Sequence, residues 1–124
     1  MIPGLNDTEL ESILEASSEA GAAYAGYILI RLPLEVKDLF VEWIKTHYPN
    51  KAARVLGLIK ETREGKLYYS EFGTRMSGTG HYAEMLAKRF QVACRRFGLN
   101  MERPQLDTGR FRVPPRKGDQ VRLF

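Results

Sequence analysis

The sequence predicts a mainly helical α/β fold with one buried strand. Apolar residues recur at helical spacing in four segments, whereas residues 25–32 form a nearly continuous apolar run. Such a run is typical of a strand that is covered on both faces, as in a parallel sheet. A chain of 124 residues, 44% of them hydrophobic, has the length and composition of one packed domain.

The first predicted element is an amphipathic helix over residues 7–20. Asn6 supplies an N-cap side chain and Glu9 stands at the N3 position, which resembles a capping box. Gly21 then ends the helix. The apolar residues at helical spacing are Leu10, Ile13, Leu14 and Ala20.

Residues 25–32 are the predicted strand, and Pro33 stops it. A helix, a loop and a buried strand make half of a β–α–β unit, so we expect the missing first strand to lie before Met1. The turn signal at residues 2–4 would follow that strand. The sequence holds no second strand of this quality.

Three further helices are predicted, over residues 34–47, 50–64 and 80–97. A glycine-rich loop over 66–80 precedes the last of them, and residues 100–124 are expected to run extended over the surface. The residues expected to face inward are Val36, Leu39, Phe40, Trp43, Ile44, Ala53, Leu56, Ile59, Tyr82, Leu86, Phe90, Ala93 and Phe97.

Charge is distributed unevenly along the chain. Residues 1–62 hold six Lys/Arg and nine Asp/Glu, whereas residues 63–124 hold thirteen Lys/Arg and six Asp/Glu. This asymmetry fits a surface for polyanions, a solubilising surface, or a cationic face packed on an acidic partner domain.

Several features indicate a cytoplasmic protein with no membrane partner. No apolar run reaches the roughly 18 residues that a membrane span needs. The start has neither the basic nor the apolar region of a secretory signal. Cys94 is the only cysteine, so no internal disulfide is possible and the cytosol is the expected compartment.

No metal site and no catalytic residue are predicted. Zinc and iron–sulfur sites need three or four ligands at defined spacings, whereas Cys94, His47 and His81 are isolated. Cys94 is expected to be a small core residue, and His47 to complement the dipole at the end of its helix. His81 begins a helix beside Gly80, where an imidazole can face an anion.

Two arginines are candidates for binding a substrate or an anion. Arg31 ends the predicted strand, and ligand sites of parallel α/β sheets collect at the carboxyl ends of strands. The alternative for Arg31 is a buried salt bridge. Arg75 lies in the glycine-rich loop, which resembles a phosphate-binding loop but lacks the ending of a P-loop and is otherwise a structural turn.

The sequence resembles one known family over almost its whole length. The segments that carry the resemblance are Ile2-Pro3-Gly4-Leu5-Asn6-Asp7, residues 26–33, residues 72–80, Leu86-Ala87-Lys88-Arg89-Phe90, Ala93-Cys94-Arg95-Arg96 and Leu106-Asp107-Thr108. Together they look like the C-terminal third of bacterial radical SAM proteins related to spore photoproduct lyase, often labelled DNA-repair-photolyase-like.

The resemblance implies a C-terminal fragment of a partial TIM-type barrel plus a helical extension. Residues 1–33 would be the last part of the barrel, 34–99 the extension and 100–124 a basic tail. By position, Ile2, Pro3 and Gly4 would lie near the cofactor S-adenosylmethionine, and Arg31 near substrate or cofactor. The family's [4Fe-4S] cluster motif has three cysteines and is absent here, so the chain alone would be catalytically silent and hold no cofactor.

The expected function is therefore that of the substrate side of a radical SAM iron–sulfur enzyme, which cleaves S-adenosylmethionine reductively and resembles a DNA-repair lyase. Its partners would be nucleic acid and the missing N-terminal barrel domain, or a second copy bound through exposed strand edges. The alternative is a non-catalytic docking or nucleic-acid-binding module. That module would use its basic tail and the following arginines: Arg75, Arg95, Arg96 and Arg103.

Overall fold

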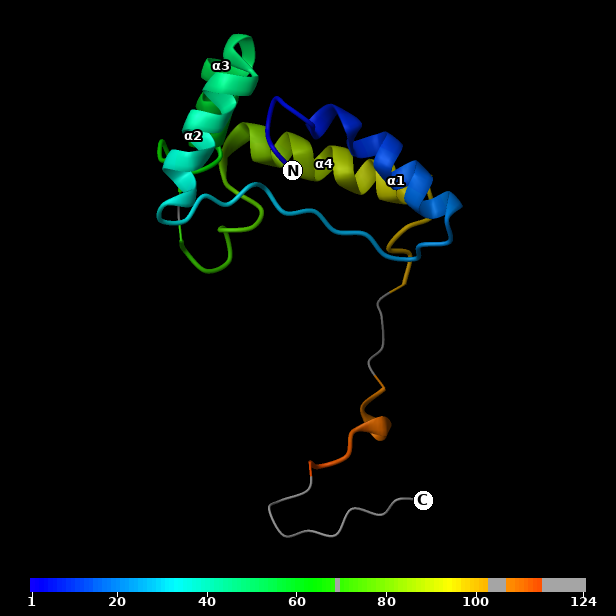
Figure 1. Ribbon diagram of the computed structural model, residues 1–124. Coiled ribbons are helices and arrows are strands. Elements are labelled where there is room, and N and C mark those ends of the chain that lie inside the picture. Colours follow the sequence, from blue (N-terminus) through cyan, green and yellow to red (C-terminus); the bar gives the residue numbers. More distant parts are fainter. Residues whose placement is uncertain (69, 103–106, 115–124) are drawn as a thin grey trace.

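A computed structural model gives the structure of this chain and describes residues 1–68, 70–102 and 107–114. Within these residues it contains four α-helices and two short 3-10 helices but no strand (Figure 1). The elements are η1 (Asp7–Glu9), α1 (Leu10–Glu19), α2 (Val36–His47), α3 (Pro49–Glu61), α4 (Gly80–Arg96) and η2 (Thr108–Arg110).

The helices form two pairs. Helix α1 lies along α4 and runs in the same direction, because Glu11 contacts Arg89 and Ser18 contacts the carbonyl of Phe97 eight residues further on. Helices α2 and α3 pack against each other at the end of the molecule where α4 begins (Figure 1). Residues 22–32 link the two pairs and run back beside α4.

The predicted strand at residues 25–32 is wrong, and with it the α/β fold class. The segment runs extended, but no neighbouring strand pairs with it among the described residues. Its apolar run has another cause, since Leu29 packs on α4 against Ala83 and Leu86. A fragment of a TIM-type barrel is likewise not seen, because the described residues form no sheet.

One residue nevertheless pairs with this segment in a parallel sense. The amino group of Met1 donates to the carbonyl oxygen of Ile28 at 2.7 Å, and the amide of Ile30 donates to the carbonyl oxygen of Met1 at 2.9 Å. Bonds from one residue to positions two apart are the pattern of parallel strands. The pairing stops there, because the chain turns at Pro3 and Gly4.

The core consists of three hydrophobic clusters. One joins α1 to the end of α4, a second joins α2 to α3, and the third joins Leu29 to the start of α4. Leu29 and Leu32 are each 1% exposed, and full burial of a leucine side chain contributes roughly 1.5–3 kcal/mol. The buried members are Leu10, Leu14, Ala93, Cys94 and Leu99; Leu32, Ile44, Ala52, Val55 and Ile59; and Leu29, Ala83 and Leu86.

The four predicted helices are confirmed within a few residues at each end, but two details are wrong. Asn6 does not cap the first helix, because its side chain accepts the amide of Ile2 at 2.8 Å instead. On α3 Ile59 is buried as predicted, but Ala53 is exposed and the other buried residues are Ala52 and Val55. On α2 only Ile44 is fully buried, while the remaining predicted face is partly or largely exposed.

Part of the predicted tail lies outside the described residues. Arg103, which belongs to the predicted basic surface, and Leu106, which belongs to the resemblance, are among these positions. Tyr69, in the loop before α4, also lies outside the described residues. Among the helices that are described, none combines the length and the apolar character needed to cross a lipid bilayer.

Candidate functional site

Arg31 lies at the carboxyl end of the extended segment and is partly buried. Its Nε atom is buried and has no hydrogen-bond partner, and no salt bridge of Arg31 is found among the described residues. The salt bridge considered as an alternative from the sequence is therefore not formed within the part of the chain that is described. A buried donor without a partner is costly, so an acceptor bound at this Nε atom would be stabilising.

Arg63, just after α3, lies close enough to Arg31 for the two charges to interact. Arg63 is 2% exposed, and burial lowers its pKa, with the nearby charge of Arg31 lowering it further. Its guanidinium donates to the carbonyls of Leu29 (3.3 Å), Ile30 (3.1 Å) and Thr74 (3.2 Å). These neutral acceptors satisfy its donors but do not neutralise the two positive charges.

The glycine-rich loop is bonded to the extended segment and to the turn after α3. Met76 accepts the amide of Leu29 at 2.9 Å, and the amide of Thr79 donates to the carbonyl of Thr62 at 3.0 Å. The hydroxyl of Thr74 is buried without a hydrogen-bond partner. We call Arg31, Arg63 and Thr74 the arginine site, because Arg63 lies near the charge of Arg31 and donates to the carbonyl of Thr74. Two of its polar atoms, Arg31 Nε and the Thr74 hydroxyl oxygen, are buried without a partner, and such donors suit an oxyanion.

Arg75 is next to Thr74 in sequence but faces a different neighbour. Its guanidinium carbon lies 5.1 Å from the ring centre of Phe72, and that ring is 86% exposed. Among the described residues no contact joins Arg75 to Arg31. The structure therefore separates the two predicted anion-binding residues: Arg31 lies in the arginine site, and Arg75 lies against the exposed ring of Phe72.

Ile2, Pro3 and Gly4 form a turn that is packed against α3. Pro3 is fully buried, and Gly4 has a φ of +73°, with the Cδ1 of Leu58 only 2.8 Å from where a Cβ would stand. Ile2 packs on the cluster between α2 and α3. The side of the turn that faces α3 is thus filled by protein, and it offers no recess for an adenosyl group there.

A polar network fixes the same turn to α4. The hydroxyl of Tyr82 donates to a carboxylate oxygen of Asp7 at 2.5 Å, and Asp7 is 3% exposed. Burial and this hydrogen bond raise the pKa of Tyr82 to about 12. Arg89 donates to the backbone carbonyl of Asp7 and forms a two-bond ion pair with Glu11. That pairing lowers the pKa of Glu11.

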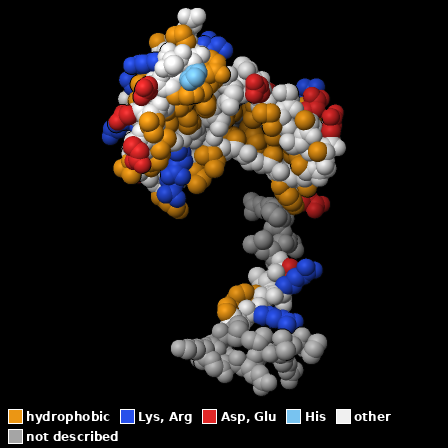
Figure 2. Space-filling model, viewed as in Figure 1, with side chains coloured by type: hydrophobic (Ala, Val, Ile, Leu, Met, Phe, Trp, Pro, Cys, Tyr) orange, Lys and Arg blue, Asp and Glu red, His pale blue; other side chains and the backbone are white. Residues whose placement is uncertain are grey.

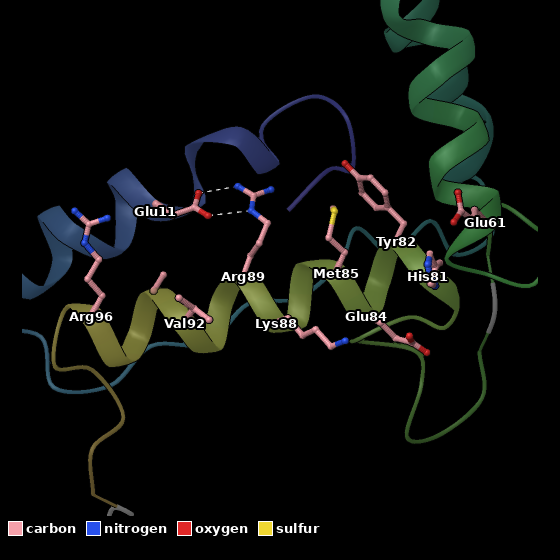
Figure 3. A pocket seen from close by; sticks show the side chains of 11 residues that line it. Glu11, Glu61, His81, Tyr82, Glu84, Met85, Lys88, Arg89, Val92 and Arg96 are labelled. Carbon is pink, nitrogen blue, oxygen red and sulfur yellow. Dashed lines mark hydrogen bonds and ion pairs between the residues drawn. The ribbon is translucent and has the colours of Figure 1, made fainter.

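The network borders an open groove of about 790 Å³ between α1, α3 and α4. Figure 3 shows the ion pair between Glu11 and Arg89 spanning one part of it, with Tyr82 and Met85 on the α4 side. Both acidic and basic side chains line it. The lining residues are Glu11, Glu61, His81, Tyr82, Glu84, Met85, Lys88, Arg89, Val92, Ala93 and Arg96.

The described residues do not fit an iron–sulfur cluster. Among them no group of three or more His, Cys, Asp or Glu side chains lies close enough to hold a metal ion. Cys94 is buried on α4 against the α1 leucines, and burial raises the pKa of its thiol, which disfavours the thiolate that a cluster needs. His47 lies at the exposed end of α2, where the centre of its ring is 5.6 Å from the ring centre of Trp43.

The sequence did not indicate Arg63, Thr74, Asp7 or Tyr82 as members of a site. Arg63 follows a helix end and looks like an ordinary surface cation, and only the tertiary fold buries it. The sequence pattern places Asp7 at the start of a helix. No pattern of spacing connects Asp7 to Tyr82, which are 75 residues apart.

No protein-family model, no curated protein and no solved structure matches the chain.

Proposed function

We propose that this chain is the substrate-side segment of a radical SAM iron–sulfur enzyme of the spore photoproduct lyase group. The proposal gives the chain the task of binding and orienting a substrate that carries oxyanions, such as nucleic acid. Reductive cleavage of S-adenosylmethionine would be supplied by a [4Fe-4S] cluster bound to cysteines of another polypeptide segment. The chain alone would be catalytically silent.

The observation that carries the proposal is the parallel pairing of Met1 with Ile28 and Ile30. Met1 and the extended segment run in the same direction, so the residues that follow each of them lie at the same end of the pair. Residues 2–4 and Arg31 therefore lie at one end. These are the positions that the resemblance assigns to cofactor and substrate. The unpaired donors of the arginine site at that end support the binding of an anionic group.

The test is reconstitution in two steps. Treated with iron and sulfide, the chain alone is expected to develop no stable [4Fe-4S] absorbance and to leave S-adenosylmethionine intact. Added to a cluster-bearing barrel segment of the spore photoproduct lyase group, it should raise production of 5′-deoxyadenosine in the presence of DNA. Cleavage by the chain alone, or no rise in the mixture, would contradict the proposal.

A second candidate is a non-catalytic module that binds single-stranded nucleic acid. It is favoured by Phe72, whose exposed ring beneath Arg75 is a surface on which a base can stack. Arg95 and Arg96 are also exposed, and Arg96 lies 5.2 Å from the ring centre of Phe97. The described part of the chain places these arginines at the end of α4.

Salt dependence separates this candidate from an unspecific charge effect. Binding of a short oligothymidylate should weaken linearly in a log–log plot, with a slope of roughly −0.7 per phosphate contacted. Phe72→Ala should weaken binding with little change in this slope, because stacking does not release counterions. The exposed control Lys51→Met should leave affinity nearly unchanged. No binding at low salt would eliminate the candidate.

A further inference from the structure

The two edges of the extended segment 24–30 are not alike. In an extended chain the backbone groups of odd and even residues point to opposite edges. Odd residues are largely paired, since Asn100 bonds both the amide and the carbonyl of Ala25 at 2.9 Å. The amide of Leu29 bonds Met76, and its carbonyl accepts from Arg63.

The even edge is open over most of its length. Within the described part of the chain, the amide and carbonyl of Tyr24 and Gly26 and the amide of Ile28 form no hydrogen bond. The Met1 pairing occupies only the last part of this edge, at Ile28 and Ile30. A row of unpaired amides and carbonyls is a template for an added strand.

The side chains on the two faces differ as well. Ala25, Tyr27 and Leu29 face α4, where the ring of Tyr27 lies 4.9 Å from that of Phe90. On the opposite face Tyr24 and Ile28 are each 49% exposed. In Figure 2, hydrophobic side chains lie at the surface over the middle of this view, between the two helix pairs. The open edge thus borders an apolar surface.

We propose that residues 24–28 are the docking edge for a parallel β-strand of another polypeptide segment, with the direction and register set by Met1. Met1 donates to Ile28 and accepts from Ile30, so a strand that ends in line with Met1 continues the same pattern. Its residue two places before Met1 donates to the carbonyl of Gly26 and accepts the amide of Ile28. Its residue four places before Met1 donates to Tyr24 and accepts the amide of Gly26.

The register also defines the chemistry of the partner strand. Residues level with each other in parallel strands share a face, and Met1 packs with Leu29 on the α4 side. Alternate residues of the partner strand would therefore face α4, and the others would pack beside Tyr24 and Ile28. The set that faces α4 needs to be apolar, whereas β-branched residues of either polarity suit the set beside the half-exposed Tyr24 and Ile28. The fitting partner is therefore a strand whose α4-facing residues are apolar.

A second copy of this chain fits the edge less well. Two copies related by a two-fold axis across the edge would pair antiparallel, whereas the Met1 pattern is parallel. The inference goes beyond the proposed function, because it concerns strand docking and depends on neither radical chemistry nor substrate. The docking test can therefore fail while the proposed function holds, and the proposed function can fail while the docking test succeeds.

The test joins a probe strand directly to the amino end of the full chain. A seven-residue segment of alternating valine and threonine is placed before Met1, with a glycine–serine segment of equal length as control. Amide hydrogen exchange should slow at least about tenfold at Gly26 and Ile28 with the valine–threonine segment only. The amide of Tyr27 points to the other edge and should not change.

A matched pair of substitutions sharpens the result. No atom lies within 4 Å of a Cβ built at Gly26, so Gly26→Ala should retain protection of Ile28. Gly26→Pro removes the amide that the probe strand must accept, and should lower that protection to the level of the glycine–serine control. Equal exchange with both fused segments, or protection at Tyr27, would overturn the proposal. So would a dimer that protects Gly26 and Ile28 without any probe strand.

Discussion

The guanidinium of Arg63 donates a hydrogen bond of 3.3 Å to the backbone carbonyl of Leu29. Through its bonds to Ile30 and Thr74, the same buried side chain joins the extended segment to the glycine-rich loop. Among the described residues only Met1 pairs with this end of the segment in the manner of a strand, so Arg63 supplies further contacts that a sheet would otherwise make.

Replacing Arg63 with methionine should destabilise the fold by about 3 kcal/mol, because buried carbonyls lose their donors. Methionine retains much of the apolar stem, so the loss reports mainly the hydrogen bonds. Urea unfolding followed by circular dichroism measures the difference. Lys51→Met on exposed α3 is the control and should change stability by less than about 0.5 kcal/mol. A loss at Arg63 no larger than at Lys51 would show that these bonds contribute nothing.

Gly78→Ala should be more damaging than Gly73→Ala. Both glycines have positive φ, +78° and +101°, so each substitution strains the backbone by about 1 kcal/mol. Only at Gly78 would the new Cβ also meet neighbours, at 2.8 Å from Leu29 Cδ1 and 3.0 Å from the Thr62 carbonyl. Thermal unfolding of the two variants tests this order, and equal melting temperatures would contradict the packing of the loop on Leu29.

Tyr82→Phe should destabilise the fold by about 1–3 kcal/mol at neutral pH, since it leaves the buried carboxylate of Asp7 without its donor. The control is Tyr24→Phe, because Tyr24 is 49% exposed and its hydroxyl has no hydrogen bond in the described structure. Unfolding by urea at pH 7 compares the two. Similar stability of both variants would mean that the contact with Asp7 is not maintained in solution.

The same tyrosine makes stability depend on alkaline pH. The folded pKa of Tyr82 is raised from 10.0 to about 12, so the folded protein retains a proton that the unfolded chain loses. Its contribution is complete below pH 10 and decreases as the pH rises from 10 to 12. The stability of the native protein should therefore fall more steeply in this window than that of Tyr82→Phe. Parallel curves for the two proteins would contradict the raised pKa.

Arg31→Met should weaken the binding of an anion without loss of stability. The substitution removes a buried Nε that has no acceptor, and it relieves the repulsion that lowers the pKa of Arg63. We expect a melting temperature equal to or above that of the native protein, and an affinity for oligothymidylate at least about threefold lower. A large drop in melting temperature would instead assign Arg31 a structural role.

Residue patterns were sufficient for the helices. Periodicity located all four within a few residues, and Gly21 and Gly98 have the positive φ expected at helix ends. They were not sufficient for the segment 25–32, because a continuous apolar run looks the same whether strands or a helix cover it. Here α4 covers one face, and the described residues provide no neighbouring strand.

The candidate site was only partly visible before the fold was known. Arg31 was identified from its place at the end of an apolar run, and the structure leaves its Nε without a partner. Arg63 was not identified, because its burial depends on contacts with Leu29 and Thr74 that no local pattern encodes.

The sequence alone therefore determined the local elements of this protein: its helices, their ends and the uneven distribution of charge. These depend on interactions within a few residues, which spacing and residue type express directly. Only the tertiary structure decided which polar groups are buried together, as for Asp7 with Tyr82 and Arg31 with Arg63. It also decided which edge of residues 24–28 stays open, because hydrogen bonds between distant segments follow from packing and not from composition.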